Sequence, residues 1–267
     1  MNIHDLNDFS YDLRKLIVHY SFKAKTGHLG SNLSIVEIIS VIFNERIYNK
    51  KIKSKDKFIL SKGHASIVYF CALLILKKIK KKDLDTIFND NSLFGGHITS
   101  NIKDIIFSTG SLGHGLPYAA GLAFASKQKK LNEKIFVVIS DGELNEGSTW
   151  ETLMISSHHN LGNLFIILDN NKLQALGPTK GILNTGNLKK KFKSFELNVY
   201  ECNGHNKRSL KSFVNLKKSK KPNILIANTI KGYGINFMEN KLKWHYTSLN
   251  TENYNLALKN VRYIDEK

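Results

Sequence analysis

The sequence has few of the residues that mark several classes of protein. Among 267 residues there are only two cysteines, Cys71 and Cys202, too few for a disulfide framework and typical of a reducing compartment. There are only three prolines, and 42% of the residues are hydrophobic, so Pro-rich linkers and intrinsic disorder are not expected. No apolar run is long enough to span a membrane, and the first residues do not form a signal peptide. These absences predict a globular, cytoplasmic protein.

Arginine is also scarce, although the chain is strongly basic. Lys and Arg number 40 against 22 Asp and Glu, a net charge of +18, but only four of the basic residues are arginines. Lysine is the weaker residue for bidentate recognition of bases and phosphates, and these lysines are scattered along the chain. The charge therefore favours a solvated basic surface over a nucleic-acid interface, with a basic nucleic-acid-binding protein kept as an alternative.

The order of apolar patterns indicates an α/β fold. Short β-branched runs alternate with stretches of helical periodicity, and Ser34 followed three residues later by Glu37 predicts a capping box. This alternation predicts three α/β/α layers around a mostly parallel sheet, in one domain over residues 1–267. We expect strands at 58–60, 135–139, 164–168, 198–201 and 223–228, and helices at 8–25, 35–43, 65–78, 117–127, 148–159, 206–221 and 251–262.

Two polar clusters follow neighbouring strands of this sheet. Asp141 and Gly142 come directly after the strand at 135–139, and Asn171 follows the next strand. The carboxyl ends of parallel strands are where open α/β sheets bind their ligands. A carboxylate, an amide oxygen and a backbone carbonyl near Leu173 suit Mg²⁺ or Ca²⁺ rather than zinc. Because Gly142 lets its backbone N–H approach a phosphate oxygen, these residues predict a divalent metal bridging a diphosphate.

The same segment resembles the thiamine diphosphate motif, in which Gly-Asp-Gly is followed by Asn-Asn, with Ser140 in place of the first glycine. Further stretches match, in order, the N-terminal half of transketolase, so the resemblance covers nearly the whole chain. These stretches are Gly27-His28-Leu29-Gly30-Ser31, Leu60-Ser61-Lys62-Gly63-His64-Ala65, Gly96-His97, Gly110-Ser111-Leu112-Gly113, and Lys231-Gly232-Tyr233-Gly234 with Trp244-His245.

The resemblance implies a thiamine diphosphate-binding fold and a set of cofactor contacts. Asp141, Asn171 and the Leu173 carbonyl would bind the metal, while Gly110 and Leu112 would hold the aminopyrimidine. The residues implied to contact the cofactor or its metal are His64, Gly110, Leu112, Asp141, Gly142, Glu146, Asn171, Leu173 and His245.

Four histidines are implied to act in catalysis. His64 and His245 would lie near the diphosphate and the reacting carbon, and His28 and His97 near the C1 hydroxyl and carbonyl of the sugar. Imidazoles suit these positions because they donate and accept protons near neutral pH. His205, in contrast, has no motif around it, and we expect it at the surface or in the core.

The resemblance also implies a partner. In this family the carboxylate that activates the pyrimidine lies in a second, pyrimidine-binding domain, which we expect on a separate chain in an α₂β₂ assembly, with Glu146 at a dimer contact. The implied reaction transfers a two-carbon ketol unit from a ketose or ketose phosphate to an aldose, through dihydroxyethyl-thiamine diphosphate. Deoxyxylulose-phosphate synthase and the E1 component of a dehydrogenase remain alternatives within the same cofactor class.

Overall fold

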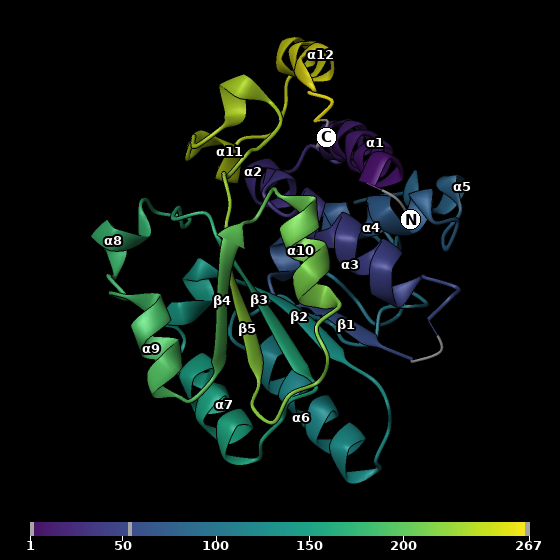
Figure 1. Cartoon of the computed structure of the whole chain (residues 1–267). Helices are drawn as coiled ribbons and strands as arrows, with labels where there is room; N and C mark the ends of the chain where they lie inside the picture. The colour runs from purple at the N-terminus through teal and green to yellow at the C-terminus, as the bar shows by residue number, and fades with distance from the viewer. Residues whose placement is uncertain (1–2, 53–54, 265–267) are drawn as a thin grey trace.

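The computed structural model describes residues 3–52 and 55–264. Its strands form one sheet in the order β1-β2-β3-β5-β4 (Figure 1). Each neighbouring pair is parallel, which confirms the expected parallel sheet. The strands are β1 (Lys57–Leu60), β2 (Ile135–Ser140), β3 (Leu164–Asn170), β4 (Asn198–Asn203) and β5 (Asn223–Asn228).

The helices occupy the expected places, with several short additions. The helix predicted over 206–221 is shorter than expected and ends at Val214. Within the described ranges, no helix combines the length and apolar character needed to cross a membrane. The helices are α1 (Ile3–Lys23), α2 (Leu29–Leu33), α3 (Val36–Ile42), α4 (Ser66–Ile75), α5 (Lys81–Leu84), α6 (Gly115–Gln128), α7 (Gly147–His158), α8 (Thr179–Ile182), α9 (Leu188–Ser194), α10 (Lys207–Val214), α11 (Lys243–Tyr246) and α12 (Thr251–Asn260).

Two hydrophobic cores, one on each face of the sheet, make this a three-layer fold. Along β2, Phe136 and Val138 pack into the core beneath α1, α3, α4 and α10. Val137 and Ile139 pack into the opposite core, beneath α6, α7 and α9. Figure 1 shows these two groups of helices on opposite sides of the strands. Because both faces are covered, the central strands consist almost entirely of apolar residues.

The predicted capping box at Ser34 is wrong. Ile35 holds the N-cap position of α3, and Ser34 instead ends α2, with its N–H donating to the Gly30 carbonyl. Because α2 runs almost directly into α3, the Ser34 hydroxyl is free to donate elsewhere, and it does so to the Asp169 carboxylate. The chain does form a capping box, but between Ser140 and Glu143 at the end of β2.

Candidate cofactor site and active centre

A cavity of about 270 Å³ lies where β2 and β3 end. The register pairs Ser140 with Asp169, so the two strands end level with each other and bring their following residues together. Each predicted site residue except His97 lines this cavity. They are His28, His64, Gly110, Leu112, Asp141, Gly142, Glu146, Asn171, Leu173 and His245.

Three residues that line the cavity offer oxygen donors. The Asp141 carboxylate is buried and accepts the Lys172 N–H at 2.7 Å, and burial together with the nearby Asp169 raises the pKa of Asp141 to about 6. The Asn171 amide oxygen accepts the Leu173 N–H at 3.0 Å. The Leu173 carbonyl accepts a hydrogen bond from the Lys231 ammonium at 2.9 Å. A buried carboxylate, an amide oxygen and a carbonyl already facing a cation form a hard-oxygen set that fits a divalent metal.

Only one of these three oxygen donors belongs to an ionisable side chain, the Asp141 carboxylate. In the part of the chain that the structure describes, no group of three or more His, Cys, Asp or Glu side chains could hold a metal. Asn145 and Gln174, which also line the cavity, are hydrogen-bonded to each other at 3.2 Å. The Asn145 Oδ1 and the Gln174 Nε2 are nevertheless buried without a partner among the described residues. Since unpaired buried polar atoms are costly, this wall fits a polar ligand such as a metal-bound diphosphate.

A fully buried ion pair supports the oxygen donors from below. The Lys62 ammonium contacts the Asp169 carboxylate at 2.5 Å, and both side chains are almost completely excluded from solvent. Asp169 also accepts a hydrogen bond from the Asn171 amide nitrogen at 3.0 Å, which turns the Asn171 oxygen away from the ion pair. Burial would raise the pKa of Asp169, but Lys62 and its hydrogen-bond donors outweigh that effect and lower it. The pair thus orients one of the three oxygen donors.

The predicted glycine turn is tied to the end of β2 by Glu143. Its carboxylate accepts the N–H groups of Gly113, at 3.1 Å, and of Ser140, at 2.9 Å. Gly113 has a left-handed φ of +78°, and a Cβ there would come within 2.6 Å of the Ser148 hydroxyl. A residue with a side chain would therefore displace the turn, so glycine is required there.

Three imidazoles from distant parts of the chain meet in the cavity. The ring centroid of His28 lies 5.3 Å from that of His64 and 4.8 Å from that of His245. The backbone N–H of His28 donates to the backbone carbonyl of His245 at 2.7 Å, and His28 has a left-handed φ of +62°. Burial lowers the pKa of all three, with help from the cationic Lys62 and Lys231, and lowers that of His245 to about 3. All three rings are therefore neutral at neutral pH.

His97 lies at the edge of this group rather than in it. Its side chain is exposed and does not line the cavity. A backbone bridge between Ile98 and Thr109 brings it beside the glycine turn, where its ring lies 3.4 Å from the point that a Cβ on Gly110 would occupy. The Glu146 side chain is also exposed, at the start of α7.

Two buried lysines of the cavity were not assigned a role from the sequence. Lys62 lies within the second histidine motif and Lys231 within the last one, so both were visible as parts of a pattern. Lys231 donates to the Leu173 carbonyl and contacts the Nδ1 of His245 at 3.0 Å. They place two ammonium groups close to the oxygen donors, that of Lys62 paired with Asp169.

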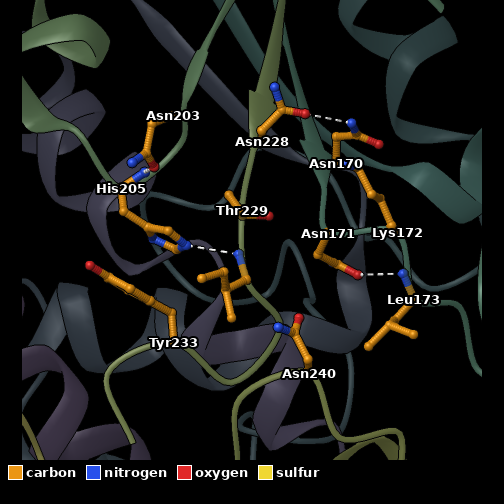
Figure 2. Close-up of a pocket in the computed structure, with 11 residues that line it drawn as sticks. Asn170, Asn171, Lys172, Leu173, Asn203, His205, Asn228, Thr229, Tyr233 and Asn240 are labelled. Carbon is orange, nitrogen blue, oxygen red and sulfur yellow. Dashed lines mark hydrogen bonds between the residues drawn. The ribbon is translucent and has the colours of Figure 1, made fainter. Parts of the chain in front are cut away.

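A larger cavity of about 780 Å³ adjoins this one, at the carboxyl ends of β3, β4 and β5 (Figure 2). It shares Asn171 and Leu173 with the cofactor cavity. Its other lining residues include four asparagines and the His205–Tyr233 pair, whose ring centroids lie 3.5 Å apart, together with Lys172, Thr229 and Ile230. The shared residues form the wall between the two spaces.

Comparison with known proteins agrees with this geometry. Residues 7–264 match the family described as transketolase, thiamine diphosphate binding domain. The crystal structure of transketolase from Campylobacter jejuni superposes with a TM-score of 0.88 and 29% identity, over 97% of this chain and 43% of that one. The chain thus spans less than half of that longer enzyme.

Two curated relatives are similar over nearly their whole length. An apulose-4-phosphate transketolase subunit of Actinobacillus succinogenes is 38% identical over 93% of this chain and 92% of the relative. The 6-deoxy-6-sulfo-D-fructose transketolase subunit of a Clostridium species is 32% identical over 95% of both. With the family match and the cavity at the ends of β2 and β3, these similarities establish that the chain belongs to the transketolase family as its thiamine diphosphate-binding domain.

Proposed function

We propose that this chain is the diphosphate-binding subunit of a two-chain transketolase. The complete enzyme transfers a two-carbon ketol unit from a ketose, or its phosphate, to an aldose. The observation that carries the proposal is the meeting of three imidazoles with the Asp141, Asn171 and Leu173 oxygens in one cavity.

The oxygen donors hold the cofactor through its metal, Mg²⁺ or Ca²⁺. Asp141, Asn171 and the Leu173 carbonyl bind the ion, and the Gly142 N–H donates to the diphosphate. Gly110 and Leu112 contact the aminopyrimidine. When bound, thiamine diphosphate supplies a thiazolium ring that stabilises a carbanion at the transferred carbon.

The histidines act on the sugar. Because the rings of His28, His64 and His245 are neutral, each carries one donor and one acceptor nitrogen and can relay a proton to or from a sugar hydroxyl. His97, exposed beside Gly110, contacts the sugar from the rim of the cavity. The ammonium groups of Lys62 and Lys231 favour anionic ligands beside these rings.

The partner chain supplies the pyrimidine-binding domain and its activating carboxylate. Two relatives of similar length are named as transketolase subunits, and the longer Campylobacter enzyme has more than half of its chain beyond the matched part. Large apolar side chains are exposed on α6 and α7, the helix that Glu146 precedes: Phe124 at 37%, Met154 at 52% and Ile155 at 55%. Such an exposed apolar face suits a protein interface and supports an α₂β₂ assembly, which we place in the cytoplasm.

The substrates belong to the class of anionic sugars. The two relatives are named for a phosphorylated and a sulfonated sugar. A net charge of +18 attracts such anions to the molecule.

The test is reconstitution with a pyrimidine-domain partner, thiamine diphosphate and Mg²⁺, followed by a ketol-transfer assay on a panel of sugar phosphates. We expect transfer only when both chains are present. D141A abolishes it and weakens Mg²⁺-dependent cofactor binding, because the only carboxylate of the oxygen set is lost. D90A, which removes an exposed aspartate that does not line the cavity, serves as the matched control.

Cofactor binding without transfer on any sugar would contradict the proposed reaction. Equal activity of D141A and D90A would contradict the proposed site.

A further inference from the structure

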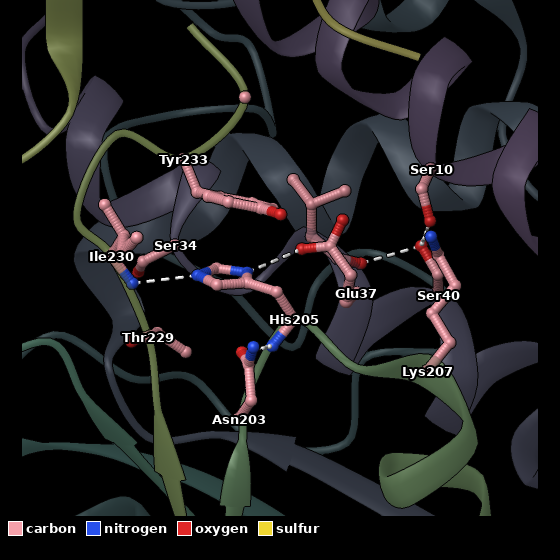
Figure 3. Close-up of polar contacts among 12 residues, drawn as sticks. Ser10, Ser34, Glu37, Ser40, Asn203, His205, Lys207, Thr229, Ile230 and Tyr233 are labelled. Atoms are coloured by element: carbon pink, nitrogen blue, oxygen red, sulfur yellow. Dashed lines mark hydrogen bonds and ion pairs between the residues drawn. The ribbon is translucent and has the colours of Figure 1, made fainter. Parts of the chain in front are cut away.

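A buried carboxylate, Glu37 of α3, lies beneath the turn that carries Lys231 (Figure 3). Its two oxygens have different partners: one forms an ion pair with the Arg14 guanidinium, and the other lies 3.0 Å from the Nδ1 of His205. Burial alone would raise the pKa of Glu37, but Arg14 and His205 outweigh this effect and lower it to about 2. Glu37 is therefore a carboxylate at all ordinary pH values.

The two partners of Glu37 reach opposite ends of one turn. The His205 Nε2 accepts the Ile230 N–H at 2.8 Å, and the Arg14 Nε donates to the Tyr233 carbonyl at 3.3 Å. We call Glu37, Arg14 and His205 the Glu37 clamp, since together they hold residues 230 and 233 from below.

The turn has glycines where the clamp requires them. Gly234 has a φ of +93°, and a Cβ there would clash with the Arg14 Nε, so the absence of a side chain makes room for the guanidinium. Gly232 has a φ of +82°, and its N–H donates to the Gly30 carbonyl at 3.0 Å. The backbone on both sides of Lys231 and Tyr233 is thus fixed, which explains the Lys-Gly-Tyr-Gly pattern in physical terms.

Lys231 extends from this fixed turn into the cofactor cavity. Its ammonium lies 3.0 Å from the His245 Nδ1 and 2.9 Å from the Leu173 carbonyl. An ammonium group can only donate hydrogen bonds, so the His245 Nδ1 must accept one. A neutral imidazole that accepts at Nδ1 has its proton on Nε2.

We propose that Glu37 is a positioning residue, which through Arg14 and His205 fixes the turn of Lys231 and so keeps the His245 proton on Nε2. This proposal rests on the proposed function only for the consequence that the Nε2–H of His245 serves the sugar. No residue of the Glu37 clamp lines the cofactor cavity, so its effect on His245 passes through the turn.

The test is the tautomer of His245 in the full-length chain, measured with ¹⁵N-labelled histidine by two-bond ¹H–¹⁵N correlation at neutral pH. An H245N variant assigns the signals. Two variants break the clamp: H205L removes both hydrogen bonds of the ring, and E37Q removes the charge that orders Arg14. A third, H205Q, keeps an amide able to accept from Ile230 and donate to Glu37. His19, whose Nδ1 lies 3.2 Å from the Tyr254 hydroxyl, serves as an internal reference.

In the wild type we expect His245 to carry its proton on Nε2 alone. In H205L and E37Q the Nδ1 signal of His245 shifts toward that of a protonated nitrogen, because Lys231 no longer donates a hydrogen bond to this Nδ1. The signals of His19 are unchanged. In H205Q the wild-type spectrum is restored. In the reconstituted enzyme, kcat falls about tenfold in H205L and remains near wild type in H205Q.

An unchanged His245 spectrum in folded H205L and E37Q overturns the proposal. Should either fail to fold, K231M carries the test, because it removes the ammonium without touching the clamp, and an unchanged tautomer there is equally decisive. The NMR experiment needs neither cofactor nor partner. If the reconstituted wild type lacks ketol transfer but the variants show the expected changes in the His245 tautomer, the proposed function is contradicted. The proposal for the Glu37 clamp then still holds.

Discussion

At the carboxyl ends of the strands, the buried Lys62 and Lys231 contact the side chains of Asp169 and His245 as well as backbone carbonyls. At the amino ends, several lysines donate chiefly to backbone carbonyls. There, Lys134 donates to the Val214 carbonyl at 3.0 Å and Lys127 to the His159 carbonyl at 2.7 Å. Lys218 and Lys221 likewise donate to carbonyls in the same region. One residue type thus has two uses in this fold. At one end lysines pair with side chains beside the cavity, and at the other they satisfy carbonyls of helix ends and loops.

The largest test of this difference is K62M. Removing the ammonium leaves the Asp169 carboxylate buried without its cationic partner, and we expect a loss of about 3–5 kcal/mol in the free energy of unfolding, measured by urea denaturation. K82M, at an exposed lysine of α5, is the control. If K62M lowers the free energy of unfolding no more than K82M does, the Lys62–Asp169 ion pair does not stabilise the fold.

Acid should destabilise the turn held by Glu37, at the carboxyl ends of the strands, before it destabilises the lysine–carbonyl contacts at the amino ends. The folded-state pKa of Glu37 is about 2, below the ordinary value of 4.5, so its contribution to stability is full above pH 4.5 and is lost as the pH falls toward 2. The difference corresponds to about 3 kcal/mol. The groups that face Glu37 are Arg14 and Lys207, which remain charged in acid, together with His205 and Tyr233.

Hydrogen exchange between pH 4.5 and 2.5 measures this separation. Amides of residues 230–234 should lose protection before those near Lys127 and Lys218 at the amino ends, because these lysines donate to backbone carbonyls, which do not titrate in this range. Uniform loss of protection at both ends, or a wild-type response in E37Q, would contradict the expectation.

A smaller effect is expected from K134M. Lys134 is buried and its pKa is lowered to about 8, chiefly by burial, while its ammonium satisfies the Val214 carbonyl. Leaving this carbonyl without a donor should lower the free energy of unfolding by about 1–3 kcal/mol. Ketol transfer in the reconstituted enzyme should remain at the wild-type level, and a specific loss of kcat would break the distinction between the two ends.

The smallest effect is expected from K127M. This lysine is exposed, so water can replace it at the His159 and Asn160 carbonyls. We expect a change within about 0.5 kcal/mol in urea denaturation. If K127M lowers the free energy of unfolding as much as K134M does, solvent exposure does not determine how much a lysine–carbonyl hydrogen bond contributes to stability.

The sequence predicted the sheet and the approach of Asp141 to Asn171 because both depend on local patterns. Apolar runs mark the strands, and parallel strands necessarily end at one edge. It did not predict the role of Glu37. The Ser34–Glu37 spacing is that of a capping box, yet α2 leaves no free helix start there, and the side chain pairs with Arg14 and His205 instead. Local spacing cannot reveal a partner far away in the chain.

The histidines show the same limit. Motifs placed His28, His64 and His245 together, and the structure brings their rings to within about 6 Å of one another. His97 was expected among them but lies exposed at the rim, since a loop without periodicity gives no direction to its side chains. His205, without a motif, lies in the core as one of the expected alternatives, but its hydrogen bond to Ile230 depends on tertiary packing.

The backbone hydrogen bond from His28 to His245 also bears on the order of folding. These residues lie near opposite ends of the chain, and closing so long a loop is entropically costly until the sheet between them has formed. The bond joins a segment that precedes β1 to one that follows β5, so the loop between them becomes short only once the strands have paired. The meeting of the first and last histidine motifs thus depends on the sheet that lies between them in the sequence.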